Sequence, residues 1–138
     1  MTWLIRNFQI SDYEQVATLW QRAGIESSPS DRPEGLLKKL ERDPELFIVA
    51  EEGDRIVGAV IGAYDGRRGW IYHLAVTPGQ QREGLGSAIM NELEHRFRAI
   101  GCEKVNLLVT PENAQVQKFY EHLGYGCNEL IFMEKWLN

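Results

Sequence analysis

The sequence predicts a layered α+β domain in which helices cover a mainly antiparallel mixed sheet. Strand-like apolar runs follow one another closely at residues 46–50, 56–61 and 70–76, which is typical of an antiparallel meander. Beyond residue 78 the apolar residues recur at helical spacing, and another strand-like run follows at residues 104–109. A strand, a helix and a second strand in this order indicate one crossover connection within the sheet.

Local signals mark the ends of the first elements. Residues 3–8 are predicted to form a first strand, and residues 11–14 have the Ser-x-x-Glu form of a capping box ahead of a helix that ends near Gly24. A second helix is expected to end at the Asp-Pro break of residues 43–44. Gly53 and Asp54 form a compact hairpin connection, so that the strands on either side pair directly.

The second half of the chain is punctuated by glycine. Gly101 is expected to cap the long helix after residue 78, and Gly124 to end a short helix that begins near residue 113. A last pair of short strands is expected within residues 126–136. The sequence therefore predicts about four helices and a single domain over residues 1–138.

Composition excludes several classes of protein. Of the 138 residues, 43% are hydrophobic and 25% are charged, as in soluble globular proteins, and neither a membrane span nor a signal peptide is recognisable. We therefore expect a cytoplasmic protein with no membrane partner. The net charge of −5 disfavours a nucleic-acid partner. Cys102 and Cys127 form no CxxC pair, so neither a disulfide framework nor a metal site is expected, and both are interpreted as buried hydrophobes.

The most informative stretch is the glycine-containing loop at residues 77–87, between a strand and a helix. The first amides of a helix lack intrahelical partners and carry a partial positive charge, so this junction suits an anion such as phosphate. Gly84 and Gly86 bring no Cβ atoms into the approach. A purely structural turn is the alternative. The loop lacks the Gly-Lys-Ser/Thr of a P-loop and the third glycine of a dinucleotide fingerprint, which disfavours both nucleotide sites.

The order Gln-Arg-Glu-Gly-Leu-Gly at residues 81–86 resembles the signature of the GNAT family of acetyl-CoA-dependent N-acetyltransferases. A second element of that family, an Asn followed by a helix ending in Phe-Tyr-Glu-x-Leu-Gly-Tyr, has its counterpart in Asn113 and residues 119–125. The resemblance covers nearly the whole chain and has a bacterial pattern. It is loosely similar to the ribosomal-protein N-terminal alanine acetyltransferases.

The resemblance implies a GNAT fold with a splayed central strand pair, between whose strands the pantetheine arm of acetyl-CoA inserts. Leu74, Ala75 and Val76 occupy the backbone positions that would contact this arm, although they are also typical core strand residues. Carried over residue by residue, the remaining coenzyme-binding positions are Gln81, Arg82, Glu83, Gly84, Leu85, Gly86, Ser87 and Asn113. For Asn113 the alternative is a simple helix N-cap.

The implied reaction is direct attack of a neutral primary amine on the thioester. By resemblance, Tyr120 is the general acid that protonates the departing thiolate, and packing is its alternative role. No base carries over, because the positions where relatives place one hold Trp70, Tyr72 and Leu108. Strand alternation predicts His73 on the face opposite Tyr72, as a packed or surface histidine. Acidic residues of hairpins and loop edges could act only through a water: Glu51, Glu52, Asp65 and Glu112.

The acceptor is left open between a protein N-terminus and a small-molecule amine. A site without a strong base would favour an α-amine, whose ordinary pKa of about 7.7 to 8.0 leaves much of it neutral, over a lysine near 10.4. A non-catalytic acyl-CoA-binding or sensing module of the same fold is the alternative function. A homodimer also stays open as a partner.

Overall fold

The computed structural model describes residues 3–80, 84–110 and 113–137. They fall into two compact units, Met1–Leu108 and Val109–Asn138, which we describe separately. The larger unit holds the whole sheet and three of the helices, and the smaller one holds a single helix and the C-terminal segment. A single acetyltransferase domain over residues 1–138 stays a prediction.

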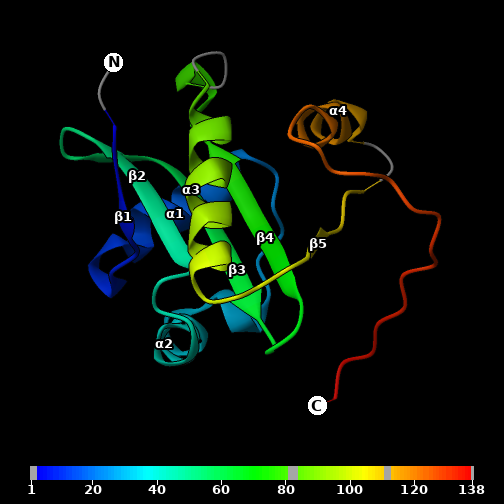
Figure 1. Ribbon diagram of the computed structural model, residues 1–138. Coiled ribbons are helices and arrows are strands. Elements are labelled where there is room, and N and C mark those ends of the chain that lie inside the picture. Colours follow the sequence, from blue (N-terminus) through cyan, green and yellow to red (C-terminus); the bar gives the residue numbers. More distant parts are fainter. Residues whose placement is uncertain (1–2, 81–83, 111–112, 138) are drawn as a thin grey trace. The chain divides into compact units, whose positions relative to one another are not determined.

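Five strands form one sheet in the order β1-β2-β3-β4-β5 (Figure 1). The first four strands pair antiparallel, and β5 pairs parallel with β4. Their bounds are β1 (Leu4–Asn7), β2 (Phe47–Glu52), β3 (Arg55–Tyr64), β4 (Gly69–Val76) and β5 (Val105–Leu107). The predicted meander and its single crossover are therefore confirmed.

Helices of the larger unit cover both faces of this sheet. They are α1 (Tyr13–Arg22), α2 (Pro33–Arg42) and α3 (Leu85–Ala99), and the same unit has short 3-10 turns η1 (Ile10–Asp12), η2 (Pro29–Asp31) and η3 (Pro78–Gln80). The smaller unit has the helix α4 (Ala114–His122). In Figure 1, α3 crosses one face of the sheet and α1 lies behind it. No helix in the described part of the chain is long and apolar enough to cross a membrane.

The helix α1 begins differently from the sequence-based expectation. Asp12 accepts a hydrogen bond from the Gln9 backbone N–H at 2.8 Å, so the local cap precedes η1, and the predicted Ser11–Glu14 box is wrong. Arg6 explains the shift, because its guanidinium bonds both Asp12 carboxylate oxygens at 2.8 and 2.9 Å and fixes the carboxylate beside Gln9. A contact between strand and turn therefore overrides the local signal.

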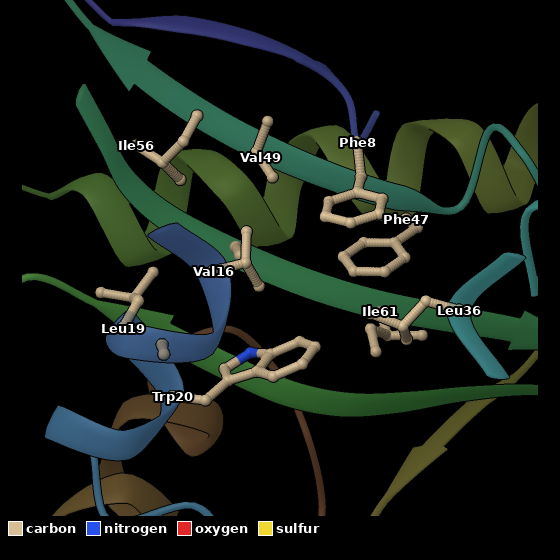
Figure 2. Packing of buried hydrophobic residues seen from close by; sticks show 11 residues of the cluster. Phe8, Val16, Leu19, Trp20, Leu36, Phe47, Val49, Ile56 and Ile61 are labelled. Atoms are coloured by element: carbon tan, nitrogen blue, oxygen red, sulfur yellow. The ribbon is translucent and has the colours of Figure 1, made fainter. Parts of the chain in front are cut away.

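One face of the sheet packs against α1 and α2 (Figure 2). Val16, Leu19 and Trp20 of α1 meet the side chains of β2 and β3, and Phe8 stacks on Phe47 with ring centroids 4.0 Å apart. These residues are almost completely buried. Removing one such aromatic side chain typically costs about 3–5 kcal/mol, so this layer holds the first helices firmly on the sheet.

The opposite face packs against α3, and two glycines of β3 allow its close approach. A Cβ atom at Gly58 would lie 2.5 Å from Ile89 Cδ1, and one at Gly62 would lie 2.9 Å from Leu93 Cδ1. Ile89 and Leu93 have no exposed surface. Tight packing therefore fixes α3, and with it the start of this helix, against the middle of the sheet.

The predicted final strand pair is wrong. Within the described part of the smaller unit, residues 125–137 form no strand. Leu130, Ile131 and Met133 are at least 85% exposed. A strand needs a neighbour to take its backbone hydrogen bonds, and the residues described in the smaller unit supply none, so β-propensity alone does not produce one here.

Acid should weaken the Arg6–Asp12 contact. Burial opposes ionisation of Asp12, but the hydrogen bonds from Arg6 and Gln9 outweigh it and lower the pKa below its ordinary value of 3.8. A lowered pKa means that the stabilisation is present above that value and is lost as pH falls through the lower folded value. We expect Asp12→Asn to reduce the free energy of unfolding by about 1–3 kcal/mol at pH 7 and by much less at pH 3, measured by urea denaturation.

The matched control is Asp54→Asn, because Asp54 lies exposed in the hairpin turn between β2 and β3. It should leave the free energy of unfolding unchanged at both pH values. A deficit for Asp12→Asn that stays constant from pH 7 to pH 3 would contradict the role given to its charge.

Candidate functional site

The last two strands of the sheet, β4 and β5, separate along their length. β5 pairs with β4 only along Gly69–Ile71, opposite Val105–Leu107, whereas β4 continues to Val76. From Tyr72 onwards, the edge of β4 that faces away from β3 therefore has no strand partner among the described residues of the larger unit. Its N–H and C=O groups can pair with an extended ligand that has amides of its own. The predicted splayed strand pair is confirmed, and in the described sheet it is formed by the last two strands of the order.

The predicted contact positions lie on this open edge. Ala75 is 3% exposed and belongs to the core cluster, while Leu74 and Val76 are half-buried. Their side chains hold the strand in place, and their backbone groups are the part that the splay exposes. Packing and ligand contact are therefore compatible at these three positions.

A bulge interrupts β4 in the middle of the open stretch. Ile61 pairs with Tyr72 and Ala59 pairs with Ala75, so three steps along β4 match two along β3. His73 has φ = 56°, and it is the one non-glycine residue with positive φ in the described ranges. An extra residue of this kind reverses which face the following side chains occupy. The expectation that alternation places His73 opposite Tyr72 is therefore wrong.

The His73 side chain contacts one residue of α1 and one residue of η2. Its Nε2 lies 3.0 Å from Asp31 Oδ2, its ring meets the Trp20 ring edge-on with centroids 5.0 Å apart, and the Trp20 indole N–H donates to its carbonyl oxygen at 3.1 Å. Both the backbone and the side chain of His73 are thus held from the α1 side of the sheet.

Asp31 is a buried carboxylate, with 7% of its surface exposed. It also accepts a hydrogen bond from the Ser28 backbone N–H at 3.0 Å. Burial opposes its ionisation, but the hydrogen bonds from His73 and Ser28 outweigh this and lower the pKa of Asp31. The carboxylate is therefore negatively charged at neutral pH and faces the imidazole.

The N-terminus of α3 forms the second part of the site. Gly84 is exposed with φ = 80° and precedes the helix, and the Ala88 N–H makes the first intrahelical bond, to Gly84 O at 3.0 Å. The amides of residues 85–87 lie ahead of that bond, where a helix has free donors and positive potential. Leu85 is fully buried, and Gly86 and Ser87 are half-buried. Gln81, Arg82 and Glu83 lie outside the described residues.

Residues 77–80, which follow β4, are anchored by hydrogen bonds. Thr77 bonds the carbonyl of Val57 through its backbone N–H at 2.9 Å and its hydroxyl at 3.1 Å. Gln80 donates to Glu52 and accepts from the Trp3 indole. The described residues that follow the open edge of β4 are therefore held in place, and the start of α3 belongs to the same unit.

The smaller unit holds the other two predicted residues. Asn113 occupies the N-cap position of α4, but its exposed side chain makes no capping hydrogen bond, so the simple N-cap interpretation is not supported. Tyr120 is 7% exposed and packs edge-on against Tyr125 with centroids 5.5 Å apart. Burial raises the pKa of Tyr120 to about 12, so the phenol keeps its proton throughout the neutral range.

The other base candidates offer little. Trp70 is half-buried, and Leu108, 56% exposed, is a hydrocarbon. Burial raises the pKa of the Tyr72 phenol. Among the remaining acidic candidates, Glu51 bonds Arg6, Asp65 accepts two turn amides, and Glu112 lies outside the described residues. Glu52 accepts from Gln80 through Oε1, and its buried Oε2 has no hydrogen-bond partner among the described residues.

Sequence reasoning missed Asp31 and Trp20 as partners of His73. In the sequence, Asp31 indicates only a loop, because no spacing rule relates two residues 42 positions apart. Cys127 also differs from expectation, since it is exposed while Cys102 is buried. Within the described ranges no three His, Cys, Asp or Glu side chains cluster in a way that could hold a metal ion.

Comparison with known proteins agrees with this geometry. The family model of the GNAT acetyltransferases matches residues 10–125. An acetyltransferase of Yersinia enterocolitica is 41% identical over 96% of this chain and 94% of its own length, and one of Sodalis glossinidius is 38% identical over 94% and 91%. The crystal structure of Ard1 from Thermoplasma volcanium superposes with a TM-score of 0.84 at 26% identity, covering 94% of this chain and 86% of that protein.

A structure of the PaiA N-acetyltransferase of Thermoplasma acidophilum in complex with coenzyme A has a TM-score of 0.83 at 21% identity, covering 95% of this chain and 94% of that protein. At this identity the likeness shows the fold alone. The five-stranded mixed sheet, the split between β4 and β5 and the glycine-led start of α3 thus occur together with a family match over most of the chain. The chain belongs to the GNAT acetyltransferase family.

Proposed function

We propose that this protein transfers the acetyl group of acetyl-CoA to a primary amine by direct attack. The observation that carries this proposal is the open backbone edge of β4 leading into the N-terminus of α3. An extended amide-containing arm and a pyrophosphate are the two parts of coenzyme A, and this edge and helix start suit them in that order.

The donor is assigned to the residues that the family signature marks. The pantetheine amides pair with the backbone of Leu74, Ala75 and Val76, and the pyrophosphate binds the amides of residues 82–87, with Gln81 as the first residue of the signature. Gly84 leaves the approach open, because a Cβ atom there would meet nothing within 4 Å and the space is free for a ligand. Asn113, with its side chain uncommitted to capping, supplies a further polar contact.

The reaction needs a neutral amine. Its nitrogen attacks the thioester carbonyl carbon, a C–N bond forms, and the C–S bond then breaks with the electron pair leaving on sulfur. Tyr120 is the proposed acid at that sulfur. A thiol has an ordinary pKa of about 8.5. Because the phenol is the weaker acid, we expect Tyr120 to act mainly as a hydrogen-bond donor that stabilises the developing thiolate.

Two measurements test the function. Saturating acetyl-CoA should raise the melting temperature of the protein, since a ligand that binds only the folded state stabilises it. A mass-spectrometric screen of peptide N-termini and small amines should then find an acetylated product. Thermal stabilisation without any product or coenzyme A release would favour the alternative, a non-catalytic acyl-CoA-binding module.

Gly84→Ala should weaken acetyl-CoA binding about tenfold or more, because the added methyl group occupies the approach to the helix amides. The φ of 80° also strains an alanine there, so a control must carry the same strain. Gly101→Ala provides it, since Gly101 has φ = 86°, likewise meets nothing within 4 Å, and lies at the other end of α3. Equal affinities of the two variants by calorimetry would place the pyrophosphate elsewhere.

Tyr120→Phe should lower kcat about 10- to 100-fold while changing the Kd for acetyl-CoA less than about threefold, because the hydroxyl stabilises charge that develops only as sulfur departs. Steady-state kinetics and calorimetry separate the two quantities. Tyr13→Phe, on the core side of α1, is the matched control and should be unchanged. An unaltered kcat for Tyr120→Phe would assign this residue to packing.

The acceptor is expected to be an α-amine in preference to a lysine. At pH 7.4 about one lysine amine in a thousand is neutral, whereas an α-amine is substantially so. Peptides of one sequence, offering either only a free α-amine or only a lysine, should therefore differ at least tenfold in kcat/KM. Equal turnover of the two would contradict this preference.

A further inference from the structure

We propose that His73 is the proton acceptor for the acceptor amine and that Asp31 holds its imidazole for this task. The inference rests on the proposed function, transfer to a primary amine, and assigns the base that the family comparison left without a residue. It comes from the bulge in β4, which carries His73 to a face where strand alternation would not place it.

His73 belongs to the stretch of β4 that the splay leaves open. The partner strand β5 stops opposite Ile71, and His73 follows two residues later. Its side chain lies on the α1 side of the sheet, against Trp20 and Asp31, on the same face as Tyr72, which is 44% exposed. An amine that approaches the open edge from this face therefore meets the imidazole.

The contact with Asp31 selects the tautomer. A buried carboxylate 3.0 Å from Nε2 accepts a hydrogen bond, so this nitrogen carries the proton and Nδ1 keeps its lone pair. Nδ1 has no hydrogen-bond partner in the part of the chain that the structure describes. A quarter of the His73 side chain is exposed, so the free nitrogen can be reached from solvent.

The surroundings of His73 place one charged group, a carboxylate, against its ring. Asp31 of η2 is the charged group in contact with His73, Trp20 of α1 brings an uncharged indole, and β3 presents Ala59 and Ile61 to this stretch. Tyr72 adds a phenol on the same strand. Asp31 holds the imidazole in place through this contact, as the carboxylate positions the histidine in a nucleophile–histidine–carboxylate triad.

The proton balance is complete. The ammonium form of the acceptor gives one proton to Nδ1, and the neutral nitrogen attacks the thioester carbon. As the C–S bond breaks, the nitrogen's second proton passes by way of water to the departing thiolate. The imidazolium then returns its proton to water. Asp31 stays ionised throughout and acts as a positioning residue.

The test is the pH dependence of a His73→Gln variant with acetyl-CoA and a pool of lysine-free peptides with free N-termini. Below pH 7 we expect kcat/KM to fall about 100-fold, within the range that a general base contributes. Above pH 9 the loss should shrink to a few-fold, because an α-amine is then neutral without help. Asp31→Asn should show a smaller loss with the same pH dependence. His95→Gln, on the exposed face of α3, should match the wild-type protein.

A loss for His73→Gln that is the same from pH 6 to pH 10, or no loss, would overturn the proposal. Should that variant fold poorly, the pH dependence of Asp31→Asn decides in the same way, and long-range nitrogen–proton NMR of the wild-type ring must show the Nε2–H tautomer. Acetyl-CoA binding distinguishes a failure of the role given to His73 from a failure of the proposed function. If the kcat/KM of His73→Gln is reduced equally at every pH and acetyl-CoA still raises its melting temperature normally, only the role of His73 is contradicted. If the wild-type protein acetylates no peptide, the proposed peptide acceptor is contradicted instead.

Discussion

Between Tyr72 and Ala75, β4 contains one residue more than the stretch of β3 opposite it, and the arrangement of the candidate site depends on that irregularity. Without it, the two strands would continue in register and Ala75 would leave the core cluster that it now joins. With the extra residue, β4 keeps its core contacts on both sides of the bulge, and the His73 side chain lies on the α1 side of the sheet. The bulge lies where β5 has already separated, so no interstrand ladder on that side opposes it.

A positive φ at a residue with a side chain costs of order 1 kcal/mol or more, and the surrounding structure must hold it. Here the Trp20 indole holds the carbonyl of His73, and Asp31 holds its ring. Trp20 is itself fixed by the packing of α1 on the sheet, and Asp31 is fixed by Ser28, the residue before η2. The strained residue is therefore secured by contacts that belong to the hydrophobic core and to a short turn.

Most of the fold could be predicted from the sequence because its signals are local. The hairpin at Gly53, the glycine end of α3 at Gly101 and the apolar period of α3 each depend on a few neighbouring residues, and the structure has all three. The capping box at residues 11–14 failed because Arg6, from a strand, recruits Asp12. The last strand pair failed because a strand depends on partners that propensity does not supply.

In the candidate site, too, the features that depend on neighbouring residues could be predicted from the sequence, and those that depend on distant residues could not. The proposed coenzyme-binding loop is contiguous in the sequence, so a short ordered motif can predict it, and the helix amides that follow need only a helix start and a glycine. The pair of His73 and Asp31 joins residues 42 positions apart through a register change in β4, and neither the change nor the pairing has a sequence period. The proposed pyrophosphate contact thus depends on one contiguous segment, whereas the proposed handling of the acceptor's proton depends on how three elements, α1, η2 and β4, meet.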